Sequence, residues 1–82
     1  MNRFKLHEKA IQLALERGEI DYINFAKIAD IHPSYASQVL AEAARLDDRV
    51  VYYRGALYSM KAFRERRLAE LKAKYGVDQN EG

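Results

Sequence analysis

The chain has 82 residues, of which 49% are hydrophobic and 32% are charged, so it can form one small domain around a single apolar core. It contains no cysteine, which excludes disulfides and thiolate metal sites, and its two histidines are too few to form a site alone. The net charge of +2 is too small to indicate a partner by itself. Because no signal peptide and no membrane-spanning segment is evident, we expect a soluble cytoplasmic protein.

Residues 3–17 are predicted to form a helix, because apolar side chains recur there at spacings of three and four. Gly18 follows directly, where glycine commonly ends a helix in the left-handed conformation. His7 is interpreted as a solvated surface residue. The apolar face consists of Phe4, Leu6, Ala10, Ile11, Leu13, Ala14 and Leu15.

Residues 21–46 are predicted to form two short helices joined by a tight turn. Asp21 is a suitable N-cap, since its carboxylate can accept hydrogen bonds from the first-turn N–H groups. Asp30 tolerates the left-handed conformation that ends a helix sharply, and Pro33 suits the first turn of the next helix. His32 is expected to help cap that second helix. The apolar face of the first helix consists of Ile23, Phe25, Ala26, Ile28 and Ala29.

The second of these helices has one apolar and one polar face. The predicted buried stripe consists of Ala36, Val39, Leu40, Ala43 and Leu46. The opposite face consists of Ser34, Tyr35, Ser37, Gln38, Ala41, Glu42 and Arg45.

Residues 50–60 are predicted to form a β-hairpin, because β-branched and aromatic residues flank Arg54 and Gly55. If these two residues form the loop, the strand partners are Val51 with Tyr58 and Tyr52 with Leu57. Arginine is unfavourable at a positive φ, so a longer loop over residues 53–56 is the alternative. The predicted core face contains Val51, Tyr58 and Met60. The predicted outer face contains Tyr52 and Leu57.

Residues 61–76 are predicted to form a C-terminal amphipathic basic helix that ends at Gly76. Its segment 61–75 carries six basic and two acidic side chains, a net charge of +4, whereas residues 1–60 are neutral. The helix either folds back on the body or pairs with a second copy, and its basic face either follows a phosphate backbone or is simply solvated. The apolar stripe consists of Phe63, Leu68, Leu71 and Tyr75. Residues 77–82 are predicted to be a disordered tail.

Helix, helix-turn-helix and hairpin, in this order, resemble the winged helix-turn-helix family. The segment FAKIADIHPSYASQVL carries the helix-turn-helix resemblance, and an ordinary pair of antiparallel helices is the alternative. The resemblance implies a mainly α fold with a small β-hairpin, a winged helix-turn-helix domain over residues 1–60, and the C-terminal helix in addition. It also implies that the link at residues 19–21 forms a strand of one or two residues that pairs with the hairpin.

The resemblance further implies that the second helix enters the DNA major groove. Gln38 is expected to read a base, because its amide can pair with adenine in a bidentate way. Tyr35 either contacts DNA or packs against the core, and Arg54 corresponds to the tip of the wing. Glu42 departs from the pattern, since it is expected to repel phosphates. The candidate DNA-binding residues are Ser34, Tyr35, Ser37, Gln38, Ala41, Arg45, Arg54, Lys61 and Arg64.

The resemblance therefore implies a sequence-specific double-stranded DNA-binding protein, a small transcriptional regulator that is similar to those found in archaea and their viruses and plasmids. We expect a homodimer formed through the C-terminal helix, the N-terminal helix or both. No catalytic residue, cofactor, metal or small-molecule substrate is predicted, because no triad, ligand cluster or glycine-rich phosphate loop is present. The alternative is a protein–protein interaction module in a larger assembly, with Tyr52 and Leu57 exposed for a partner.

Overall fold

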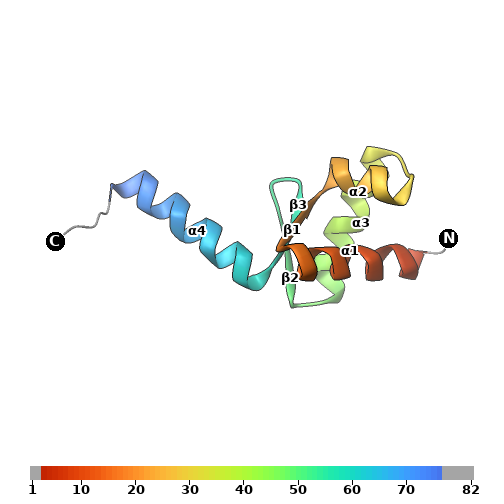
Figure 1. Ribbon diagram of the computed structural model, residues 1–82, viewed down its shortest axis with the longest axis horizontal. Coiled ribbons are helices and arrows are strands. Elements are labelled where there is room, and N and C mark those ends of the chain that lie inside the picture. The colour runs from red at the N-terminus through yellow and green to blue at the C-terminus, as the bar shows by residue number, and fades with distance from the viewer. Residues whose placement is uncertain (1–2, 77–82) are drawn as a thin grey trace.

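The computed structural model describes residues 3–76 as a helical body with a small sheet, from which a last helix projects (Figure 1). The expected mainly helical chain with a small β element is confirmed. The tail predicted at residues 77–82 lies outside the described residues. The elements are α1 (Arg3–Arg17), β1 (Glu19–Asp21), α2 (Tyr22–Ala29), α3 (Pro33–Leu46), β2 (Val50–Tyr53), β3 (Ala56–Ser59) and α4 (Met60–Tyr75).

The three strands form one antiparallel sheet in the order β1-β3-β2. The expected strand at residues 19–21 is present, and its central Ile20 pairs with Leu57. Arg54 and Gly55 form a two-residue turn with φ angles of 50° and 81°, as a type I′ turn requires. The shorter of the two predicted loops is therefore confirmed, together with the predicted pairs Val51–Tyr58 and Tyr52–Leu57.

The predicted helix caps are confirmed by their hydrogen bonds. The carboxylate of Asp21 accepts from the N–H groups of Ile23 and Asn24, both at 3.2 Å, and so begins α2. Asp30 ends α2 in the left-handed region, with φ 57°. Nδ1 of His32 accepts from the N–H of Ser34 at 3.1 Å, and Pro33 occupies the first turn of α3. These local bonds set the sharp turn between α2 and α3.

The core lies between the three N-terminal helices and one face of the sheet. Its largest fully buried side chains each contribute about 1.5–3 kcal/mol by leaving water. They are Phe25, Val39, Leu40 and Leu57. Leu46 was predicted to continue the buried stripe of α3, which is wrong, because this last residue of the helix is 62% exposed.

The two faces of the hairpin are opposite to the prediction. Leu57 is fully buried and faces the helical core together with Val50, whereas Tyr58 lies on the other face beneath α4. Met60 is the first residue of α4, not the end of a strand. Both faces of the hairpin are apolar because helices cover both, so alternation alone does not distinguish them.

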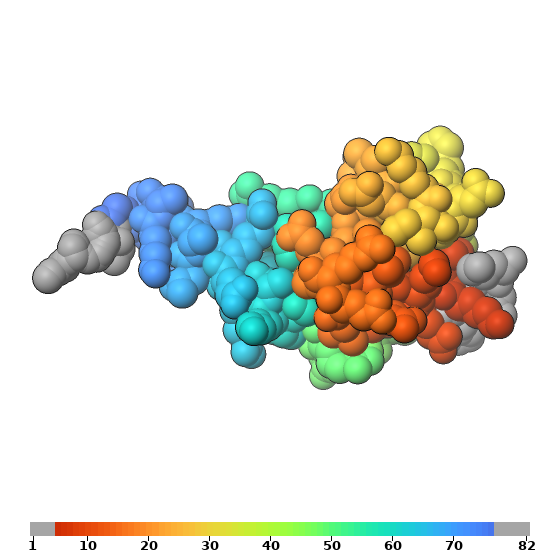
Figure 2. All heavy atoms as spheres, viewed as in Figure 1, coloured from red at the N-terminus to blue at the C-terminus, as the bar shows by residue number. Residues whose placement is uncertain are grey.

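Helix α4 contacts the sheet along its first three turns, from Phe63 to Glu70, and then extends away from the body (Figure 2). Phe63 packs on Tyr53 and Tyr58, with ring centroids 5.4 Å and 6.4 Å away. Leu68 belongs to a different face, since five residues turn a helix by about 140°. The predicted single stripe is therefore divided. The exposed part consists of Leu68, Leu71 and Tyr75, at 55%, 39% and 66% exposure.

Candidate nucleic-acid interface

The outer side of α3 carries a row of four residues that face away from the core. Because their spacings are four, three and four, the members lie above one another, opposite the buried face. Within residues 3–76, the side chains of Gln38 and Arg45 form no hydrogen bond or ion pair. The half-buried Ser37 borders the row. The row consists of Ser34, Gln38, Ala41 and Arg45.

Two of the predicted DNA-contact residues also have structural roles. The hydroxyl of Ser34 lies 2.9 Å from Nδ1 of His32 and is part of the helix cap. Tyr35 is half-buried and packs against the core, as one of its two predicted roles requires. The outer residues of α3 that have no structural role are therefore Gln38, Arg45 and the small side chains beside them.

Glu42 does not belong to the outer row, although the sequence interpretation placed it there. Its Oε1 lies 3.0 Å from Nε2 of His7, and the carboxylate is directed towards α1. His7 was predicted to be solvated, which is also wrong, because it is 6% exposed. The pair forms because the side of α3 that carries Glu42 packs on α1. One consequence is that no carboxylate lies in the outer row.

In the turn that follows α3, the carboxylate of Asp47 is paired with Arg49. Asp47 accepts two hydrogen bonds from Nε of Arg49, at 3.0 Å and 3.2 Å, and one from its Nη2 at 2.7 Å. The guanidinium holds the pKa of Asp47 down at about 2. A paired carboxylate of this kind opposes a nearby phosphate less than an isolated one does.

The hairpin turn and α4 together form a basic cleft. Arg54 lies over the ring of Tyr53 at 5.3 Å from its centroid, and faces a hollow of about 250 Å³. Glu70 is the acidic residue of this hollow, and the hydrogen bond from Tyr53, followed by that from Arg67, lowers its pKa. The sequence interpretation missed Lys74, although its spacing of seven from Arg67 places both on one helix face. The lining consists of Arg54, Arg67, Glu70, Leu71 and Lys74.

Lys61 and Arg64 are exposed on α4 but are not gathered with the α3 row. Helix α4 covers the outer face of the sheet, while α3 packs on the inner face, so the sheet separates the two helices (Figure 1). The candidate residues therefore form three groups, on α3, at the hairpin turn and on α4.

Comparison with protein-family models, with curated proteins and with solved structures finds no match for this chain. None of the helices in the described part of the chain combines the length and the apolar character needed to cross a lipid bilayer.

Proposed function

We propose that this protein is a winged helix-turn-helix protein that binds double-stranded DNA in a sequence-specific manner and regulates transcription as a homodimer. The observation that carries the proposal is the outer row of α3, which holds no carboxylate and in which the exposed side chains of Gln38 and Arg45 form no hydrogen bond or ion pair within residues 3–76. The element order and the sheet order β1-β3-β2 are compatible with this family. In our proposal, α3 lies in the DNA major groove, as the second helix of a helix-turn-helix does, and its outer row faces the base edges.

Each group of residues has a distinct role in this proposal. The Gln38 amide donates to and accepts from adenine, and Ser37 and Arg45 bond to neighbouring bases or phosphates. Arg54 contacts the phosphate backbone from the hairpin turn, and the basic cleft behind it adds positive charge. Lys61 and Arg64 add backbone contacts only where the DNA passes along α4, because the sheet lies between them and α3.

The test compares Gln38→Ala with Arg54→Ala on a cognate duplex, obtained by selection from random DNA, and on a random duplex. Gln38→Ala should cost about 1–3 kcal/mol on the cognate site and little on random DNA. Arg54→Ala should weaken binding to both and lower the salt slope by about one unit. Fluorescence anisotropy titrations at several salt concentrations measure both effects.

Lys9→Ala is the matched control, since it removes one positive charge from the exposed side of α1 and should leave both affinities unchanged. Equal losses for Gln38→Ala on the two duplexes would contradict base reading. Failure of the unmodified protein to bind any duplex at low salt would contradict DNA binding itself.

The exposed apolar residues of α4 support a second candidate, a protein–protein interaction module. Its original support was an exposed Tyr52–Leu57 pair, and that support is lost because Leu57 is fully buried. Leu68 and Tyr75 are the alternative contact residues. Binding to a protein partner that is insensitive to salt, without DNA binding, would favour this function.

A further inference from the structure

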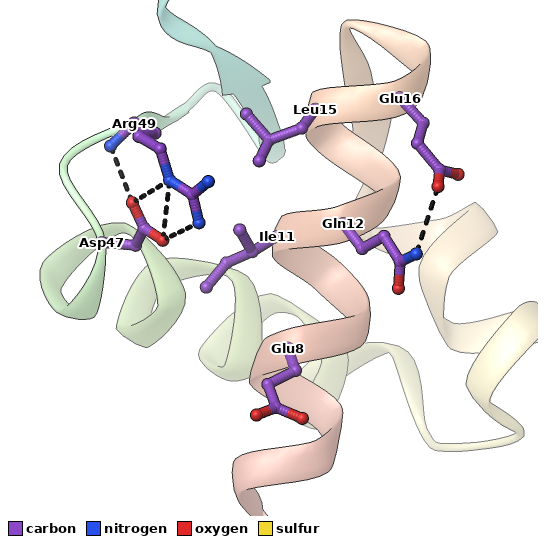
Figure 3. Close-up of a pocket in the computed structure, with 7 residues that line it drawn as sticks. All are labelled: Glu8, Ile11, Gln12, Leu15, Glu16, Asp47 and Arg49. Carbon is purple, nitrogen blue, oxygen red and sulfur yellow. Dashed lines mark hydrogen bonds and ion pairs between the residues drawn. The ribbon is translucent and has the colours of Figure 1, made fainter.

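A groove of about 340 Å³ runs along α1, beside the turn that follows α3. Figure 3 shows Ile11 and Leu15 pointing across this groove towards the Asp47–Arg49 pair. Of these two apolar residues, Leu15 is 38% exposed and Ile11 is half-buried. The groove therefore presents apolar side chains to solvent that the fold leaves uncovered.

An acidic row borders these apolar side chains. Glu8, Gln12 and Glu16 follow one another at spacings of four on α1 and line the groove. Among residues 3–76, neither Glu8 nor Glu16 forms an ion pair with a cation, whereas Asp47 is neutralised by Arg49. An occupant of this groove should therefore combine an apolar stripe with flanking positive charge.

Helix α4 of the same chain has this combination on its exposed side. Arg64 and Lys72 lie one turn before and one turn after Leu68, and all three are exposed. Leu71 and Tyr75 extend the apolar stripe. Glu65 is the acidic neighbour, but the helix as a whole carries four more positive than negative charges.

We propose that α4 of one copy docks in the α1 groove of a second copy. Within one chain, α4 extends away from the body and its outer half does not return to α1 (Figure 1). Two-fold symmetry makes the exchange reciprocal, so that each copy donates one helix and receives one. This inference rests on the homodimer of the proposed function, but not on DNA binding, and it names the surfaces that join the two copies.

The experiment exchanges the charges of the two surfaces in the full chain. Glu8→Arg with Glu16→Arg, or Arg64→Glu with Lys72→Glu, should weaken the dimer by about tenfold or more, since each places like charges together. All four substitutions together should restore the dimer to within about threefold of the original dissociation constant, because the charges are again opposite. Sedimentation equilibrium over a concentration series measures these constants, and circular dichroism checks folding.

An apolar variant gives a second test that does not depend on charge. Leu15→Asp should dissociate the dimer, whereas Ile28→Asp on α2, with similar exposure of 40%, should leave it intact. A protein that is monomeric at all concentrations, or a dimer that neither charge reversal weakens, would overturn the proposal.

DNA titrations of the unmodified protein and of the Glu8→Arg with Glu16→Arg variant, which retains Arg64, separate the two proposals. A dimer that follows the charge exchange but binds no duplex would contradict the proposed function and leave the interface standing. Salt-dependent DNA binding by a protein that never dimerises would contradict the proposed interface and leave the proposed DNA binding standing.

Discussion

The two ring nitrogens of His7 lie in different surroundings. Nε2 lies 3.0 Å from Oε1 of Glu42, whereas Nδ1 is buried without a hydrogen-bond partner among the described residues. Glu42 therefore provides the one polar contact described for this buried ring. Loss of such a contact leaves polar atoms desolvated, and the resulting cost exceeds the net value of the hydrogen bond itself.

Glu42→Ala should lower the free energy of unfolding by about 1–3 kcal/mol, because the buried His7 ring loses its acceptor. Urea unfolding followed by circular dichroism measures this change. Gln38→Ala is the control on the same helix, and an exposed residue of this kind should change stability by no more than about 0.5 kcal/mol. Equal stability of the Glu42 variant and the unmodified protein would contradict a structural role for the pair.

Arg54 holds an unusual backbone conformation for its side chain. Its φ of 50° lies in the left-handed region, which costs residues other than glycine about 1–2 kcal/mol. Asparagine or glycine would occupy this turn position with less strain. Strained residues that persist in a fold are concentrated at functional sites, which supports the role proposed for Arg54 in DNA contact.

The elements meet differently on the two faces of the sheet. The inner face joins the helical core through Leu57, and the outer face joins α4 through Tyr53 and Tyr58. The O–H of Tyr53 donates to Oε1 of Glu70 at 2.9 Å, and Arg67 donates to the same oxygen at 2.8 Å. This network sets the direction in which α4 leaves the sheet.

Glu70→Gln should destabilise the protein at neutral pH, and its difference from the unmodified protein should narrow in acid. The hydrogen bond from Tyr53, then that from Arg67, lowers the pKa of Glu70 from its ordinary value of 4.5. The stabilisation is therefore complete above about pH 4.5 and is lost as the pH falls through the lower folded-state pKa. Thermal unfolding between neutral pH and pH 3 measures the difference. Glu65→Gln, exposed on the same helix, should show no such trend, and a pH-independent difference for Glu70→Gln would contradict the argument.

The bounds of the elements could be predicted from the sequence, whereas the packing of the hairpin faces could not. Helix bounds, caps and the hairpin turn follow from local signals such as Asp21, Pro33 and Gly55, which act within a few residues. Local signals did not predict which face of the hairpin meets the core, because Val51 and Tyr58 are as apolar as Tyr52 and Leu57. Only the position of α4, which covers the outer face, distinguishes the two sets.

The whole molecule is elongated, with extents of 54 × 21 × 18 Å, because α4 continues beyond the sheet. Such a projecting helix leaves apolar residues in water unless a partner covers them. Helix α4 therefore carries its half of the proposed dimer contact away from α3, whereas the α1 groove that receives it lies beside the turn that follows α3 (Figure 1).

A two-fold dimer predicts the symmetry of the DNA site. Selection from a random duplex library should return inverted repeats whose centres lie about one helical turn, roughly 34–36 Å, apart or at a multiple of that distance. The physical reason is that the symmetry of the protein relates its two α3 rows. Enrichment of direct repeats or of single half-sites would contradict the symmetric dimer.

By itself, the sequence determined the helices, the tight turn between α2 and α3, the register of the hairpin and the position of Gln38 on the outer side of α3. These features depend on periodicity and on bonds between near neighbours. The tertiary structure decided that His7 is buried against Glu42, that Leu57 faces the core and that α4 lies across the sheet from α3. Those features depend on which amphipathic faces meet, and faces of similar apolar character are distinguished only by the neighbours that cover them.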